Sequence, residues 1–221
     1  MISKFKVSIT EKELKFPTMF WIPKLHKKPS KARFIANSTS CTTKNLSVLL
    51  TSCLTAIKDH VIKYCNTVYE NSGKNLFWSI KNTGDVLDKF KIRNYQASSI
   101  STYDFSTLYT TLPHALIKDK LIALIQKTFA REQLLFLACS STKAFFTNSK
   151  VKNYKMWTCD EVCKALSFLL DNIYVRFGID VYRQVIGIPM KLCTTSRRPV
   201  SLLLRKRFYA KSFSYYSVEY H

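Results

Sequence analysis

One carboxylate, Asp104, has the surroundings of a catalytic metal ligand. It stands near the end of an alternating, β-prone stretch, Ile100–Phe105, between two aromatic residues. A charge in such a place costs free energy unless it binds a cation or a hydrogen-bond donor. A strand-end Asp is typical of nucleotidyl transfer, in which two magnesium ions hold the attacking and leaving oxygens. The alternative is an ordinary turn or helix-capping Asp.

A second group of residues suits phosphate binding. Five cations lie between positions 24 and 33, with Trp21 and Phe34 on either side. They are Lys24, Lys27, Lys28, Lys31 and Arg33. Lys and Arg on a hairpin can donate hydrogen bonds to phosphate oxygens. The alternative is a solvated basic loop.

The charge of the whole chain points the same way. The 221 residues include 35 Lys and Arg against 14 Asp and Glu, a formal net charge of +21, and 47% are hydrophobic. That apolar fraction excludes a disordered basic tail, so we expect a folded chain with a polyanionic partner such as nucleic acid. A solvated basic surface is the alternative.

Neither a membrane span nor a signal peptide is expected, because no apolar run is long enough. We therefore expect an intracellular protein without a membrane partner; nuclear or cytoplasmic location and oligomeric state are left open. Seven cysteines occur without a C-x-x-C pair. We interpret them as reduced, mostly buried thiols, not as zinc ligands.

The candidate residues need elements to position them. An apolar stretch at 16–23, a basic turn, and a short strand over Ala32–Asn37 predict a β-hairpin. Apolar spacing predicts a helix over 43–65, and a Pro in the first turn favours another at about 113–129.

Further along the chain, a Thr158–Glu161 capping box opens a third helix, with its apolar face running to Ile173. A connector over 71–84 and a short helix over Asp85–Phe90 are also expected. Gly178 predicts a turn, and Tyr182–Ile188 either a strand pair or a loop. Mixed elements without a βαβ repeat favour an α+β fold.

Four blocks of the sequence carry a family resemblance. In order they read FWIPKLHK at Phe20–Lys27, KARFI at Lys31–Ile35, YDFSTLYTTLPH at Tyr103–His114, and GIPM at Gly187–Met190. Over about residues 15–190 the chain resembles the reverse transcriptase domain of Penelope-like retroelements, relatives of telomerase catalytic subunits. The resemblance implies the fingers and a partial palm of a right-hand polymerase. It also implies RNA-directed DNA synthesis on an RNA or DNA template–primer, with Mg²⁺ and deoxynucleoside triphosphates.

The resemblance also implies a role for individual residues. Asp104 would be the first catalytic aspartate and metal ligand, the Phe105 carbonyl would touch the metal that carries the triphosphate, and Tyr109 would be the steric gate against ribose. Lys24 and Arg33 would hold the triphosphate. The motif that lines the template base and its pairing with the incoming nucleotide would comprise Gln184, Gly187, Pro189 and Met190. Lys27, Lys28 and Lys31 would contact nucleic acid.

The chain departs from the family pattern after Met190. Lys191 replaces the glycine of the family, no adjacent aspartates occur anywhere in the sequence, and after Asp180 the only carboxylate side chain is that of Glu219. The domain is therefore expected to be incomplete at 1–190, without thumb or endonuclease, and followed by an aberrant basic tail at 191–221. A shift of reading frame near Met190 is one explanation of the tail, and genuine divergence is the other. We weigh an inactive reverse transcriptase domain against a non-catalytic nucleic-acid-binding remnant and a product that does not fold stably.

Overall fold

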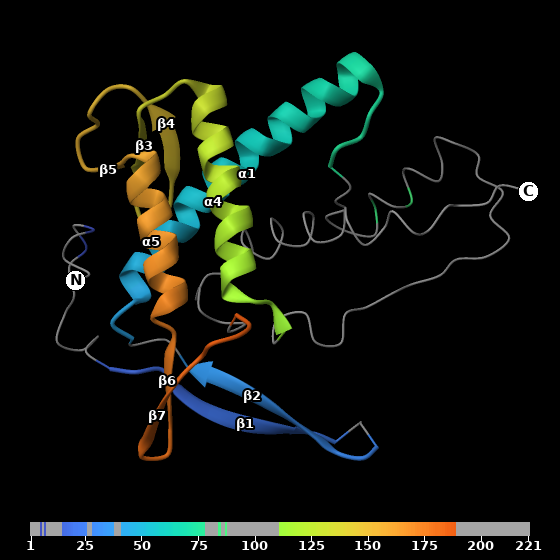
Figure 1. The fold of residues 1–221 in the computed structure, drawn as a ribbon, viewed down its shortest axis with the longest axis vertical. Helices are drawn as coiled ribbons and strands as arrows, with labels where there is room; N and C mark the ends of the chain where they lie inside the picture. Colours follow the sequence, from blue (N-terminus) through green and yellow to red (C-terminus); the bar gives the residue numbers. More distant parts are fainter. Residues whose placement is uncertain are drawn as a thin grey trace, which may run out of the picture.

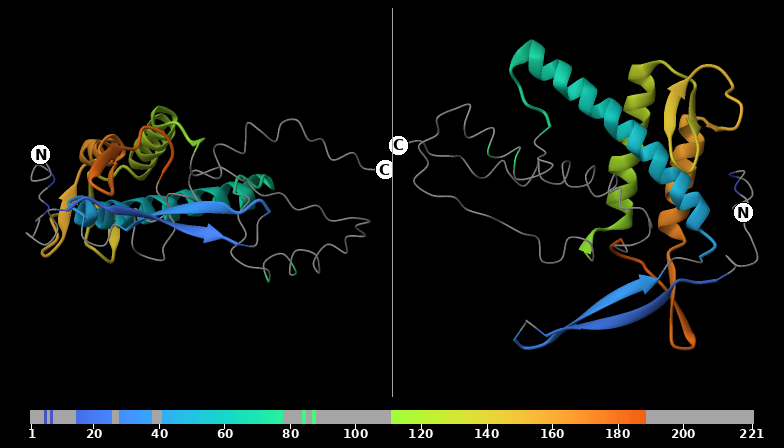
Figure 2. Two further views of the ribbon diagram at one scale, coloured as in Figure 1. Left: turned by 90° about the horizontal axis from the view of Figure 1, so that it is seen from below. Right: turned by 180° about the vertical axis from the view of Figure 1, so that it is seen from behind.

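The apolar faces of three amphipathic helices form most of the hydrophobic core of this protein. The computed structural model describes residues 5, 7, 15–25, 28–37, 41–77, 84, 87 and 111–188. The helices are α1 (Lys44–Ser72), α4 (His114–Glu132) and α5 (Cys159–Asp171). In Figures 1 and 2, α4 and α5 lie side by side and α1 crosses them obliquely on one face.

The predicted helical stripes are the buried ones. In α1 the residues Leu46, Cys53 and Ile57 are inaccessible to solvent, and in α5 so are Val162 and Ala165. The capping box of α5 is present as predicted. The Glu161 backbone N–H donates to Thr158 Oγ1 at 3.3 Å, and the Thr158 N–H donates to Glu161 Oε2 at 2.9 Å.

Two of the predicted helices have different ends in the structure. The first continues past residue 65 to Ser72, because no residue before Gly73 breaks the helix, and Gly73 forms its C-cap. The second begins at His114 and runs to Glu132, with Pro113 in an extended conformation at the N-cap.

A small antiparallel sheet that the sequence analysis did not predict covers one end of the helices. Its strands are β3 (Phe136–Cys139), β4 (Ala144–Thr147) and β5 (Lys155–Trp157), in the order β4-β3-β5. Leu137 and Trp157 from this sheet belong to the same buried cluster as the helices.

A second sheet joins two hairpins at the opposite end of the helix pair (Figure 1). Its strands are β1 (Thr18–Lys24), β2 (Lys31–Asn37), β6 (Tyr174–Phe177) and β7 (Asp180–Arg183), in the order β2-β1-β6-β7. The predicted N-terminal hairpin is thus confirmed, and so is the turn at Gly178. For 182–188, where a strand pair or a loop was predicted, the loop fits better. Only Tyr182 and Arg183 belong to a strand, β7, and residues 184–188 form the return segment after it.

The described part of the chain confirms an α+β class, with helices, one antiparallel sheet and one mixed sheet. None of its helices is both long and apolar enough to cross a lipid bilayer. The predicted strand at 100–105 and nearly all of the predicted short helix at 85–90 lie outside the described residues, as does the tail at 191–221.

Candidate nucleic-acid interface

The four-stranded sheet carries the predicted cations, and its register fixes the face on which each side chain lies. In the β1–β2 pair, Ile22 is opposite Arg33, and Lys24 is opposite Lys31. Side chains alternate between the two faces of a strand, and directly opposite residues share a face. Lys24, Lys31 and Arg33 therefore lie on one face of the hairpin.

The second hairpin extends that face. Strand β6 runs parallel to β1, with Arg176 opposite Thr18, and the Arg176 backbone N–H donates to the Pro17 carbonyl at 2.8 Å. Within the β6–β7 pair, Tyr174 is opposite Arg183. Because Thr18 shares a face with Lys24, the side chains of Arg176 and Arg183 join the first three cations.

The turn of the second hairpin depends on a glycine. Gly178 occupies the first position of the two-residue loop with φ of +64°. That value fits a type II′ turn, whose twist matches that of the flanking strands. A side chain at this position would be strained, although nothing lies near enough to clash with it.

The two faces of the sheet differ in chemistry. The cationic face carries all five Lys and Arg residues of the four strands: Lys24, Lys31, Arg33, Arg176 and Arg183. The opposite face, which we call the aromatic face, carries Trp21, Phe34, Phe177, Tyr182 and the only acid of the four strands, Asp180. Trp21 and Phe34 are directly opposite each other and more than half exposed.

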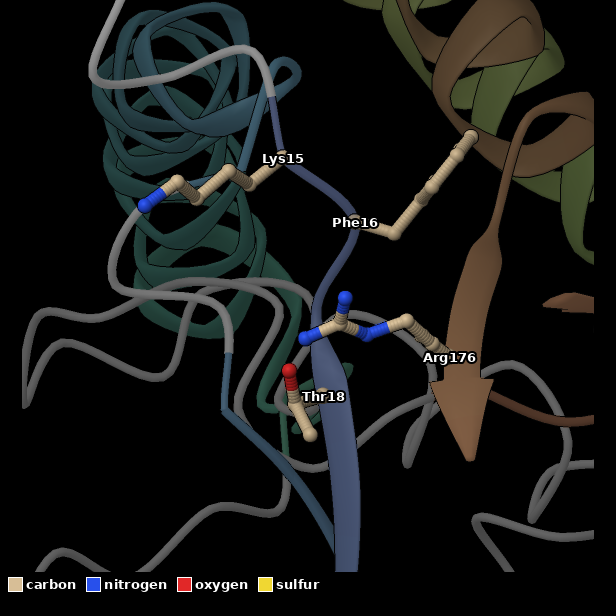
Figure 3. Close-up of a pocket in the computed structure, with 4 residues that line it drawn as sticks. All are labelled: Lys15, Phe16, Thr18 and Arg176. Carbon is tan, nitrogen blue, oxygen red and sulfur yellow. The ribbon is translucent and has the colours of Figure 1, made fainter. Parts of the chain in front are cut away.

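A hollow of about 320 Å³ lies where the two hairpins meet, lined by Lys15, Phe16, Thr18 and Arg176. Figure 3 shows the Arg176 side chain reaching from β6 toward Thr18 on β1. The Lys15 side chain points away from Arg176 in the same view, so the Arg176 guanidinium and the Thr18 hydroxyl are the groups at this hollow that can bind a phosphate oxygen.

The sheet is connected to the start of α4 by the segment that follows β7. The Gly187 backbone N–H donates to the Leu112 carbonyl at 2.8 Å, and Nε2 of His114 lies 2.6 Å from the Gly187 carbonyl oxygen. Gly187 is buried and has φ of +81°, a conformation that favours glycine. Two distant blocks of the family resemblance, those that include His114 and Gly187, are therefore in contact.

Gln184 has its own local partners. Its backbone N–H donates to the Ile173 carbonyl at 2.8 Å, and its side-chain Nε2 donates to the Ile186 carbonyl at 3.0 Å. The amide thus holds the shape of the return segment, and its side-chain oxygen is the group left for a ligand.

Half of the predicted site residues lie in the described part of the chain. Lys24, Lys31 and Arg33 share the cationic face, and Lys28 is exposed in the hairpin turn. Gln184 and Gly187 lie on the return segment. Outside the described residues are Lys27, Asp104, Phe105, Tyr109, Pro189 and Met190. Because Asp104 would hold the metal and Arg33 the triphosphate, the resemblance also predicts that both face one cleft; with Asp104 outside the described residues, this stays a prediction.

Two cations of this face were missed by sequence reasoning. Arg176 and Arg183 flank Gly178 in an alternating stretch, YVRF-GI-DVYR, which is a recognisable hairpin signal. The signal could have predicted the second hairpin, but only the pairing of β6 with β1 places both arginines on the same face of the sheet as Arg33.

A magnesium site is not formed by the described residues. Among them, no group of three or more His, Cys, Asp or Glu side chains gathers in a way that could hold a metal ion. Asp104, the metal ligand that the resemblance implies, lies outside the described residues, so the magnesium site stays a prediction.

The cysteines have the character of core residues. Five of the six described thiols are buried, as predicted, and Cys159 is half-buried. Burial raises the pKa of Cys53 well above its ordinary value, and a hydrogen bond with Cys139 adds to the rise. Burial and the neighbouring Cys159 raise the pKa of Cys163 to about 12. Thiols with raised pKa values are poor nucleophiles and metal ligands at neutral pH.

No known family model, curated protein or solved structure matches this chain. The class of site is therefore defined by its own chemistry, which is an exposed sheet face rich in Lys and Arg on an α+β chain.

Proposed function

We propose that this chain is a reverse transcriptase domain with an incomplete palm, which binds nucleic acid and deoxynucleoside triphosphates but does not extend a primer. The observation that carries the proposal is the meeting of separate blocks of the family resemblance. The blocks at 20–27 and 31–35 form the β1–β2 hairpin. The last residue of the third block, His114, contacts the first residue of the fourth block, Gly187.

The positions of Lys24 and Arg33 support a role in holding phosphates. They lie on neighbouring strands and on one face, in cross-strand pairs separated by the Pro23–Ala32 pair. Arg33 is exposed, and neither side chain forms an ion pair within the described part of the chain. Their donors are therefore available for an anionic ligand, and a guanidinium can bind a phosphate through two hydrogen bonds.

The second candidate function is nucleic-acid binding without any polymerase descent. The absence of an adjacent Asp pair from the sequence favours it, because nucleotidyl transfer requires carboxylates from more than one palm segment. Both candidates share the cationic face and differ in nucleotide binding. Competition by a deoxynucleoside triphosphate at low salt therefore separates them.

The first prediction tests the role of the hairpin cations. The double variant Lys24→Gln/Arg33→Gln should bind a fluorescent primer–template duplex more weakly than the unmodified chain. Each phosphate contact contributes about 0.9 to the slope of log affinity against log salt, so the slope should fall by about 1.8. Fluorescence anisotropy over a series of NaCl concentrations measures it.

The matched control removes two cations that lie away from the sheet. Lys150 and Lys152 are exposed on the connection between β4 and β5, and Lys150→Gln/Lys152→Gln should leave the slope unchanged. An equal loss in this control would show that bulk charge alone drives binding. Primer extension by the unmodified chain with Mg²⁺ and four deoxynucleotides, abolished in Asp104→Asn, would contradict the proposed lack of activity.

A further inference from the structure

We infer that the cationic face is a track for a single-stranded nucleic-acid backbone about six nucleotides long, in which Arg176 and Arg183 of the second hairpin are contact residues. The inference rests on the proposed function and extends it beyond the β1–β2 hairpin. It assigns a role to two residues that the family resemblance does not include.

The length of the face exceeds what a triphosphate needs. Six residue steps separate Thr18, which is opposite Arg176, from Lys24 near the hairpin turn. At about 3.3 Å per residue, the face runs for about 20 Å. In a single strand that keeps the stacked rise of a duplex, successive phosphates are about 3.4 Å apart along the axis, so about six of them cover this distance. A triphosphate can occupy only one part of the face.

All charged side chains that the four strands place on this face are positive. None of its five cations forms an ion pair among the described residues. Asp180, the one acid in the four strands, lies on the aromatic face. An extended polyanion can therefore follow the sheet without meeting an acidic side chain of these four strands.

The hollow between the hairpins is a candidate binding position, or seat, for one phosphate of the strand. Arg176 and Thr18 both line it, and Figure 3 shows the Arg176 guanidinium near the Thr18 hydroxyl, with the Lys15 side chain pointing away. Arg and Thr side chains are usual partners of a phosphate oxygen. The seat lies at the opposite end of the face from Lys24 and Lys31, so one strand can reach both.

A single strand fits the face better than a duplex. Phe20 and Tyr174 lie on the cationic face by the register of the strands, and both are more than a third exposed. Unpaired bases can stack on such rings while the backbone follows the cations, whereas the bases of a duplex are already stacked.

The test uses the full chain, a fluorescent oligothymidylate of 12 nucleotides, and anisotropy at several NaCl concentrations. Arg176→Gln/Arg183→Gln should lower the salt slope by about 1.4, since each single-strand phosphate contact contributes about 0.7. Arg176→Lys/Arg183→Lys keeps the charge and should retain the slope, and Lys150→Gln/Lys152→Gln should also leave it unchanged. With unlabelled competitors, affinity should rise steeply up to about six nucleotides and little beyond.

The outcomes separate this inference from the function on which it rests. If Lys24→Gln/Arg33→Gln lowers the slope and Arg176→Gln/Arg183→Gln does not, the track is wrong and the proposed function stands. If neither variant changes it, both are wrong. A loss in the Lys variant equal to that in the Gln variant would mean that the arginines maintain the fold, which would also overturn the track. Binding to phosphatidylserine vesicles but not to oligothymidylate would overturn nucleic acid as the partner.

Discussion

The ring of His114 connects two segments that lie 73 residues apart in the sequence. A carbonyl oxygen can only accept, so the Nε2–H of His114 must donate the 2.6 Å hydrogen bond to Gly187. The bond fixes the return segment after β7 against the first turn of α4. It thereby positions the second hairpin relative to the helices.

We predict that His114→Ala lowers the free energy of unfolding by about 1 kcal/mol, the usual net value of such a hydrogen bond. The Gly187 N–H bond to Leu112 remains, so the fold should persist. Urea denaturation should show a lower midpoint with an unchanged m-value. His114→Gln, which keeps a donor, should recover part of the loss.

The control for this prediction is Lys164→Ala, which breaks the exposed Lys164–Asp160 pair on α5. Because both side chains are largely solvated, the urea midpoint should not move. A His114→Ala midpoint equal to that of the unmodified chain would show that the ring is not what holds the return segment.

At the scale of elements, the C-terminal halves of α1 and α4 meet through charged and polar side chains. Nδ1 of His60 lies 2.9 Å from Glu132 Oε2, and Arg131 Nη2 lies 3.0 Å from Glu132 Oε1. Arg131 also donates to the His60 carbonyl and lies over the Tyr64 ring, 4.6 Å from its centre. Burial tends to raise the pKa of Glu132, but the hydrogen bond from Arg131 and the proximity of the His60 ring outweigh it and lower the pKa below its ordinary value of 4.5.

The pH dependence of stability should reveal this contact between the two helices. A carboxyl with a lowered folded-state pKa stabilises the fold above its unfolded pKa, and the contribution is lost as the pH falls through the folded value. We predict that Glu132→Gln costs up to about 1 kcal/mol at pH 6 and nothing near pH 2. Urea unfolding of both chains between pH 6 and pH 2 measures the difference. A constant difference across this range would exclude titration of Glu132 as its cause.

The elements differ in how well the sequence could predict them. The stripe from Leu46 to Ile57 predicts α1 because helical periodicity repeats over many turns, which leaves no competing pattern. Strands β3, β4 and β5 have only three or four residues each, so no period can be established over them. Their partly buried, apolar character fits a helix segment equally well.

The candidate site shows a similar division. Lys24 and Arg33 could be predicted because they lie close together in the sequence and in one hairpin. The membership of Arg176 could not, because it depends on the pairing of Thr18 with a strand far along the chain. Sequence alternation gives the face of a residue within its own strand, whereas the shared face of two hairpins comes from tertiary register.

At the scale of the whole molecule, a net charge of +21 sets the conditions under which the fold is stable. Like charges repel one another in the folded chain, and unfolding separates them. Two unit charges 10 Å apart in water repel by roughly 0.4 kcal/mol, and the screening length is about 8 Å at physiological salt. Many such small repulsion energies add up at low salt, and added salt screens them.

The last prediction is that salt and a polyanion stabilise this protein in opposite ranges of ionic strength. Without ligand, the melting temperature should rise as NaCl is increased from 20 to 300 mM, because screening removes the repulsion. At 20 mM NaCl, oligothymidylate at 100 times its dissociation constant should add about 2.7 kcal/mol to the stability. At 300 mM the same concentration should add almost nothing, since phosphate contacts weaken steeply with salt. Thermal melts over both series measure this, with an uncharged sugar at equal osmolarity as the control. A melting temperature that falls with NaCl, together with no effect of the oligonucleotide at 20 mM, would mean that the cations are neutralised within the fold and that the sheet face is not a polyanion site.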